Sequence, residues 1–135
     1  MNLSVLDTSV VSLIEKKSPL LVHYEPHYRG TRIQICFQTV AELRLWALRG
    51  NWGQKRRDKL EDLIATFDVV RSTDELTDHW ATIMDEARKA GRRLEAGDAW
   101  IAATALLLDT PLLTHDKDFD IQSCPSITVY RYAAP

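Results

Sequence analysis

The sequence predicts an α/β protein in three layers, α/β/α, in which helices cover both faces of a parallel sheet. Short apolar segments of strand length alternate along the chain with longer segments whose apolar residues recur every three or four positions. The strand-like segments are too uniformly apolar to have a face in water, which favours a parallel sheet buried on both sides. A length of 135 residues suits one compact core, so we expect a single domain over residues 1–135.

The first half of the chain begins with a short apolar strand that runs directly into a helix. A stretch with two prolines and a glycine follows, where only a short amphipathic helix is expected. The second strand is β-branched and aromatic, and the next helix opens on Thr39 and Glu42, the spacing of a capping box. The predicted elements are strand 3–6, helix 10–15, short helix 20–24, strand 33–37 and helix 39–49.

The second half continues the alternation. A charged surface helix precedes a minimal strand, and a long amphipathic helix then ends at Gly91. The central helix is rich in alanine and apolar on most sides, and Asp98 and Thr104 are its strongly polar side chains. The predicted elements are helix 54–67, strand 69–70, helix 74–90, the central helix from Asp98 to residue 108, strand 111–114 and strand 127–130.

Composition limits the possible functions. The chain is 45% apolar and 27% charged, as in globular proteins, and its net charge of -2 argues against indiscriminate, charge-driven binding to nucleic acid. Cys36 and Cys124 lack the spacing of a metal or redox motif, so we expect buried, reduced thiols and a cytoplasmic setting. We also expect neither a signal peptide nor a membrane span, because Asp7 interrupts the first apolar run.

Five acidic residues stand where parallel strands end or helices begin. Asp7 follows the first strand, Glu42 lies in the first turn of the helix after the second, Asp98 opens the central helix, and Asp116 and Asp118 follow the fourth strand. Each has an ordinary structural explanation as a helix cap, a partner in a capping box, a residue that complements the helix dipole, or a turn former. Taken singly, none of them indicates a function.

Taken together, these acids fall at the same edge of the predicted sheet, where open α/β sheets bind ligands. Several carboxylates on one edge repel one another unless a cation lies between them. Oxygen ligands without His or Cys favour Mg²⁺ or Mn²⁺, and two such ions roughly 4 Å apart would activate water for phosphodiester hydrolysis.

Four motifs at these acids resemble, in order and spacing, those of the PIN-domain nucleases, and most closely the VapC toxins of toxin-antitoxin pairs. The resemblance spans nearly the whole chain. It implies a five-stranded parallel sheet, a Mg²⁺- or Mn²⁺-dependent endoribonuclease, a homodimer, and a VapB-type antitoxin that blocks the site. The motifs are Leu6-Asp7-Thr8-Ser9, Thr39-Val40-Ala41-Glu42-Leu43, Asp98-Ala99-Trp100-Ile101-Ala102-Ala103-Thr104-Ala105 and Leu113-Thr114-His115-Asp116-Lys117-Asp118-Phe119.

The resemblance also implies roles for single residues. Asp7, Glu42 and Asp98 match the three firm acidic positions of the family, and Asp116 matches the fourth, so these four are the expected catalytic residues and metal ligands. Asp118 is an expected auxiliary ligand. The final turn is one residue tighter than its commonest form, which leaves open whether Asp116 or Asp118 contacts the metal.

Four further residues are expected to position the substrate. Thr8 and Thr114 match hydroxyl positions of the family that bond ligands or phosphate. Arg92 and Arg93 precede the central helix and could contact RNA phosphates, although basic clusters are more often solvated helix faces. His115 is expected to be a surface turn residue, and the other three histidines carry no motif.

Two competing functions differ in class from a nuclease. A PIN-like module that binds RNA or protein without cutting would lack one of the acids, and all are present. A phosphatase of the haloacid dehalogenase type would need a second aspartate two residues after Asp7, where this chain has Ser9. The sequence therefore favours hydrolysis of RNA by metal-activated water, and it does not identify the RNA.

Overall fold

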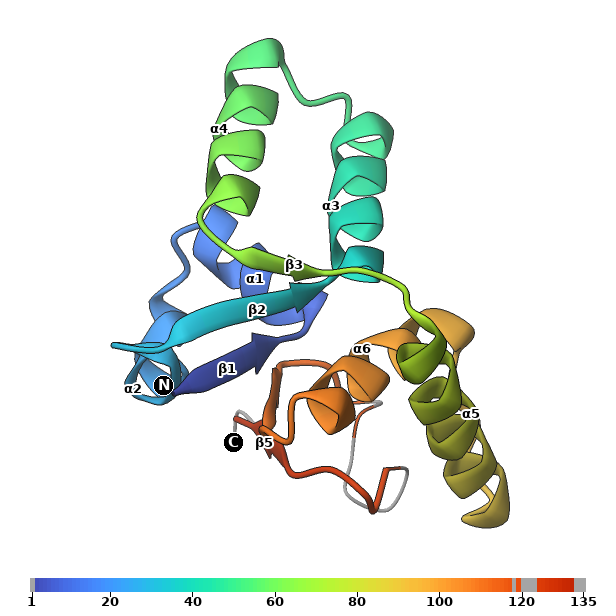
Figure 1. Cartoon of the computed structure of the whole chain (residues 1–135). Coiled ribbons are helices and arrows are strands. Elements are labelled where there is room, and N and C mark those ends of the chain that lie inside the picture. The colour runs from blue at the N-terminus through green and yellow to red at the C-terminus, as the bar shows by residue number, and fades with distance from the viewer. Residues whose placement is uncertain (1, 118, 120–123, 133–135) are drawn as a thin grey trace.

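A computed structural model describes residues 2–117, 119 and 124–132, so Asp118 lies outside the described residues. Its centre is a parallel sheet of five strands in the order β3-β2-β1-β4-β5 (Figure 1). The predicted three-layer α/β/α class is therefore confirmed. The strands are β1 (Leu3–Leu6), β2 (Arg32–Cys36), β3 (Asp68–Val70), β4 (Leu112–Thr114) and β5 (Val129–Arg131).

Every predicted helix is present, although several ends differ by about two residues, and one helix is added between β1 and β2. The expected short helix there is a 3₁₀ helix that Ser18 caps, and a separate short helix with Pro26 in its first turn follows it. Proline is tolerated at this position because the first turn leaves its N–H groups unpaired. The helices are α1 (Thr8–Glu15), η1 (Pro19–His23), α2 (Glu25–Tyr28), α3 (Phe37–Arg49), α4 (Gln54–Ala65), α5 (Asp74–Lys89) and α6 (Ala96–Leu107).

Successive residues of a strand point to opposite faces of the sheet, and their side chains therefore pack into two separate apolar cores, one on each face. Val5 and Leu112 belong to the core beneath α5 and α6, whereas Leu6 and Leu113 belong to the core beneath α1, α3 and α4. This burial on both faces explains why the strands lack polar alternation. Cys36 and Cys124 are both fully buried, as predicted.

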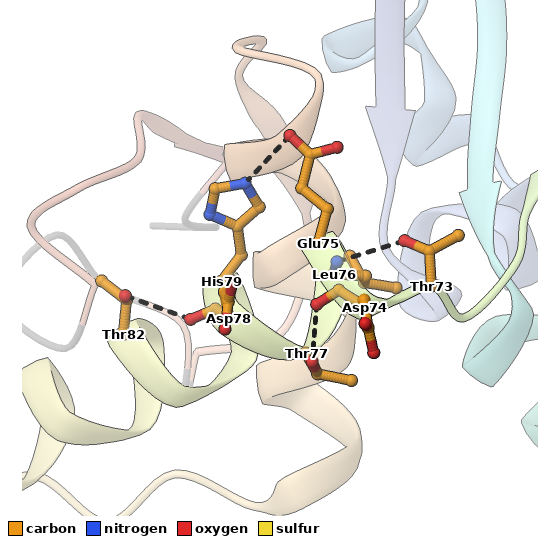
Figure 2. A network of polar contacts seen from close by, with 8 residues as sticks. All are labelled: Thr73, Asp74, Glu75, Leu76, Thr77, Asp78, His79 and Thr82. Carbon is orange, nitrogen blue, oxygen red and sulfur yellow. Dashed lines mark hydrogen bonds and ion pairs between the residues drawn. The ribbon is translucent and has the colours of Figure 1, made fainter.

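The long helix α5 begins and ends with local signals. The Thr73 hydroxyl accepts a hydrogen bond from the Leu76 N–H at 3.2 Å and so caps the first turn (Figure 2). At the other end Gly91 has a φ of 69°, a left-handed conformation that suits the residue after a helix, as the sequence predicts. Across the described residues, no helix is long and apolar enough to cross a membrane.

The strand order reverses between β1 and β4, and this point positions the acidic residues. The chain moves outward from β1 through β2 to β3 and then returns through α5 and α6 to place β4 on the other side of β1 (Figure 1). Side chains that follow β1 and β4 therefore share one edge of the sheet at its switch point, where open α/β sheets bind ligands. Asp7 lies there, and its N–H donates to the Leu113 carbonyl at 2.8 Å.

Candidate active site

Asp7 is the buried centre of the carboxylate group, with only 3% of its surface exposed. Its Oδ1 accepts from the Thr8 N–H at 2.7 Å and caps α1, which therefore begins at Thr8 and not at residue 10 as predicted. Its Oδ2 accepts from the hydroxyls of Ser9 at 2.9 Å and Thr114 at 2.7 Å. The capping explanation is thus correct for one oxygen only, and two hydroxyls fix the other.

Glu42 approaches Asp7 from α3 through the hydroxyl of Thr8. That hydroxyl lies 2.9 Å from the Thr39 hydroxyl and 3.2 Å from Glu42 Oε1, within donor reach of both. The predicted capping box between Thr39 and Glu42 is wrong, because α3 begins two residues earlier, after Cys36, and has no side-chain cap. The side chains of Thr39 and Glu42 instead lie within hydrogen-bond distance of the Thr8 hydroxyl.

Asp116 lies in the turn that follows β4. Its N–H donates to the Thr114 hydroxyl at 3.0 Å, and this same hydroxyl donates to Asp7. The neighbouring His115 N–H donates to the Ser9 hydroxyl at 2.8 Å. His115 is only half-buried, and its Nδ1 lies 2.5 Å from the hydroxyl of the buried Tyr24, so it is anchored and not simply a surface residue. The hydroxyl groups of Thr114 and Ser9 therefore connect this turn to the start of α1.

Asp98 is half-buried in the first turn of α6, which begins at Ala96. The start of this helix packs closely against α3, since a Cβ atom added at Gly97 would lie 2.7 Å from Gln38 Nε2. The Gln38 side chain in turn bonds to Glu42. The structure therefore places the turn that carries Asp98 beside the residue that supports Glu42.

The carboxylates of this site influence one another electrostatically. Burial is the main cause that raises the pKa of Asp7 above its usual range, and the charge of Asp116 adds to it, while hydrogen bonds from Thr114, Ser9 and Thr8 oppose it. Burial also raises the pKa of Glu42, followed by the charge of Asp7. Ionising Asp7 and Glu42 together therefore costs free energy, and a cation between the carboxylates would lower that cost.

The donor set fits a hard divalent cation by its chemistry, because it consists of carboxylate and hydroxyl oxygens. Across the described part of the chain, no three His, Cys, Asp or Glu side chains already converge as a finished metal site. An ion would therefore have to draw the carboxylates of Glu42 and Asp116 toward Asp7.

A stability prediction follows from the raised pKa of Asp7. The native chain without metal holds this proton to higher pH than the unfolded chain does, so its free energy of unfolding falls as pH rises from about 4 through the raised pKa. Asp7→Asn removes the charge, and the Ser9 and Thr114 hydroxyls can rotate to accept from the amide. In EDTA near pH 7 we expect this variant to gain on the order of 1 kcal/mol in stability. Urea unfolding at several pH values measures it.

The exposed Asp62→Asn on α4 is the matched control and should leave the pH dependence unchanged. If Asp7→Asn were less stable than the wild type at every pH, the cost assigned to the buried charge would be wrong.

Arg92 and Arg93 lie in the segment that joins α5 to α6. The Arg92 N–H donates to the Ala87 carbonyl at 2.8 Å, which places both residues beside the last turns of α5. The Arg93 side chain is 93% exposed, and its Nε is 3.9 Å from Glu95. Their expected role in positioning substrate stays a prediction.

Sequence reasoning missed three polar residues that organise the site: Ser9, Gln38 and Thr39. Ser9 stands in the same motif as Asp7, two positions on, where the first turn of a helix returns to its cap. This spacing could have identified it. Gln38 lies four residues before Glu42 on α3, a spacing that puts both side chains on one face of the helix. Thr39 opens the second motif, but its partner Thr8 lies on a helix distant in sequence, so that contact gives no local signal.

Comparison with known proteins agrees with this geometry. The model of the PIN domain family matches residues 4–122. The chain is 32% identical over 130 residues to Ribonuclease VapC5 of Mycobacterium tuberculosis, covering 94% of this chain and 93% of that protein, and 29% identical to Ribonuclease VapC4 of the same organism, covering 86% and 88%.

Solved structures show the same fold. The VapBC-5 toxin-antitoxin structure from Mycobacterium tuberculosis superposes with a TM-score of 0.69 and 27% identity over 98% of this chain and 100% of that one. VapBC2 from Rickettsia felis, bound to a DNA fragment from its promoter, superposes with a TM-score of 0.81 and 17% identity over 97% and 99%. With the family model and the VapC relatives in agreement, the chain belongs to the PIN-domain family, among the VapC ribonucleases.

Proposed function

We propose that this chain is a metal-dependent endoribonuclease that acts as the toxin of a toxin-antitoxin pair. The observation that carries the proposal is the approach of Asp7, Glu42 and Asp116 from three separate segments to one edge of the sheet, with raised pKa values at the first two. The relatives named Ribonuclease VapC support hydrolysis of RNA as the reaction. A binding module without catalysis remains the alternative that the experiment below tests.

Nucleases of the PIN-domain family generally depend on divalent metal ions. Here the ion is Mg²⁺ or Mn²⁺, because the donors are oxygen atoms without thiolate or imidazole in the group. Asp7, Glu42, Asp98 and Asp116 would hold it, and Asp118 would be an auxiliary ligand. When bound, the ion lowers the pKa of water and neutralises charge on the phosphate.

The side chains of this chain prepare the site for that chemistry. Thr114 and Ser9 fix one Asp7 oxygen, so this carboxylate keeps one orientation when substrate arrives. Thr8 holds Glu42 within 3.2 Å and can also contact phosphate. No nucleophilic side chain is required, and attack by water with departure of the 3′-oxygen leaves a 5′-phosphate product.

The proposed partners follow from the relatives. The similar structures from Rickettsia felis and Mycobacterium tuberculosis are of VapBC proteins, the latter a toxin-antitoxin system, so the partner of this chain is a VapB-type antitoxin that blocks the acidic edge. The active form is a homodimer in the cytoplasm.

The proposal predicts metal-dependent cleavage. Purified protein incubated with total RNA in Mg²⁺ or Mn²⁺ should produce fragments with 5′-phosphate ends, and EDTA should stop the reaction because the carboxylates cannot activate water alone. Fragments are resolved by gel electrophoresis, and their ends are tested by ligation. Equal cleavage by an Asp7→Asn preparation would identify a contaminant, and RNA binding without cleavage by the wild type would favour the binding module.

A further inference from the structure

Beyond the carboxylates, the carboxyl edge of the sheet continues onto the edge strand β5, where two histidines stack on two tyrosines. His23 lies flat on Tyr132, with ring centroids 3.5 Å apart and an interplanar angle of 6°. His27 lies on Tyr130 at 4.8 Å and 24°. We call these four residues the ring ladder.

The ring ladder lies within reach of the proposed cleavage site. Tyr132 directly follows β5, as His115 directly follows β4, and Thr114 pairs in register with Arg131. Strands in a sheet are about 4.8 Å apart, so β5 lies two strands, about 10 Å, from Asp7 at the end of β1. An RNA strand lying along this edge from the carboxylates would first meet Tyr132, and Tyr130 lies two residues back along β5.

Hydrogen bonds connect the Tyr132 end of the ring ladder to the turn after β4. The Tyr132 N–H donates to the Tyr24 hydroxyl at 3.1 Å, and that hydroxyl lies 2.5 Å from His115 Nδ1. The ring ladder is therefore linked, through Tyr24, to the turn that carries Asp116.

Three of the four rings of the ladder, those of His23, His27 and Tyr130, are exposed and therefore available to a ligand. His23 and His27 are exposed, Tyr130 is 44% exposed, and Val22 beside His23 is 66% exposed. Rings that only completed the core would be covered. Planar exposed rings bind unpaired bases by stacking, without preference for one base.

We propose that the ring ladder is a subsite that stacks unpaired bases of single-stranded RNA next to the carboxylates. This inference rests on the proposed ribonuclease function and names the side chains that would hold the RNA beside the carboxylates. Bases in a duplex are already stacked on one another, so a duplex cannot use the ladder.

Binding is tested in full-length protein that carries Asp98→Asn to prevent cleavage. A fluorescently labelled single-stranded RNA is titrated and followed by anisotropy. We expect His23→Ala with His27→Ala to weaken binding at least about ten-fold, His23→Phe with His27→Phe to retain it, and binding of duplex RNA to be unaffected by either pair. His79→Ala is the matched control, because this histidine lies on α5 beside Glu75 (Figure 2) and should change nothing.

A second measurement separates stacking from a structural role. With the other residues intact, the alanine pair should raise the KM for single-stranded RNA about ten-fold and leave kcat unchanged. An unchanged KM and affinity, or a phenylalanine pair as weak as the alanine pair, would overturn the subsite. A wild type that cleaves no RNA in metal would refute the proposed function instead, and the anisotropy titration would still decide the subsite.

Discussion

Asp98→Asn and Glu42→Gln should each lower the rate of RNA cleavage by about a thousand-fold, close to 4 kcal/mol in the activation free energy. Both changes keep the size of the side chain and remove one charge from the set that would hold the cation. An amide oxygen is a weaker ligand than a carboxylate and no longer compensates the charge of the ion. The measurement is the single-turnover rate at saturating Mn²⁺.

Glu95→Gln provides the control for both variants, because Glu95 is an exposed acid at the cap of α6, three residues before Asp98. It should keep nearly full activity. If Asp98→Asn cleaved as fast as Glu95→Gln, Asp98 would only complement the dipole of α6, and its assignment as a metal ligand would fail.

The layers of the fold could be predicted because burial on both faces leaves a pattern in the sequence. Val5 and Leu6 enter opposite cores, as do Leu112 and Leu113, so each strand is a continuous apolar run between polar turns. The exact ends were less predictable. The sequence pattern places Phe37 in the second strand, whereas the structure makes it the first residue of α3. A run of apolar residues alone does not mark where a strand becomes a helix.

The proximity of Asp7 and Asp116 could be predicted, because both follow neighbouring parallel strands, β1 and β4. The supporting contacts could not. Thr39 fits a capping box in sequence, and it was the position of Thr8 on a separate helix that decided its true partner. The ring ladder is similar, since His23 and Tyr132 lie more than a hundred residues apart and neither belongs to a motif.

Metal binding should also stabilise the fold, and the effect should depend on the same carboxylates. A ligand at a hundred times its dissociation constant adds about 2.7 kcal/mol to the free energy of unfolding, which for a chain of this size raises Tm by about 10 °C. The wild type should gain this much in saturating Mn²⁺, because the ion also relieves the cost that burial and Asp116 impose on the charged form of Asp7. Differential scanning fluorimetry with and without Mn²⁺ measures the shift.

Asp7→Asn should lose most of this gain, although it begins from a higher Tm in EDTA. Asp7→Asn should be more stable than the wild type without metal and should gain little stability from Mn²⁺. Asp62→Asn should follow the wild type in both conditions. This opposite behaviour is expected of a buried carboxylate that is retained for binding at a cost in stability. An equal Mn²⁺ shift in all three proteins would place the ion elsewhere and separate the buried charge of Asp7 from metal binding.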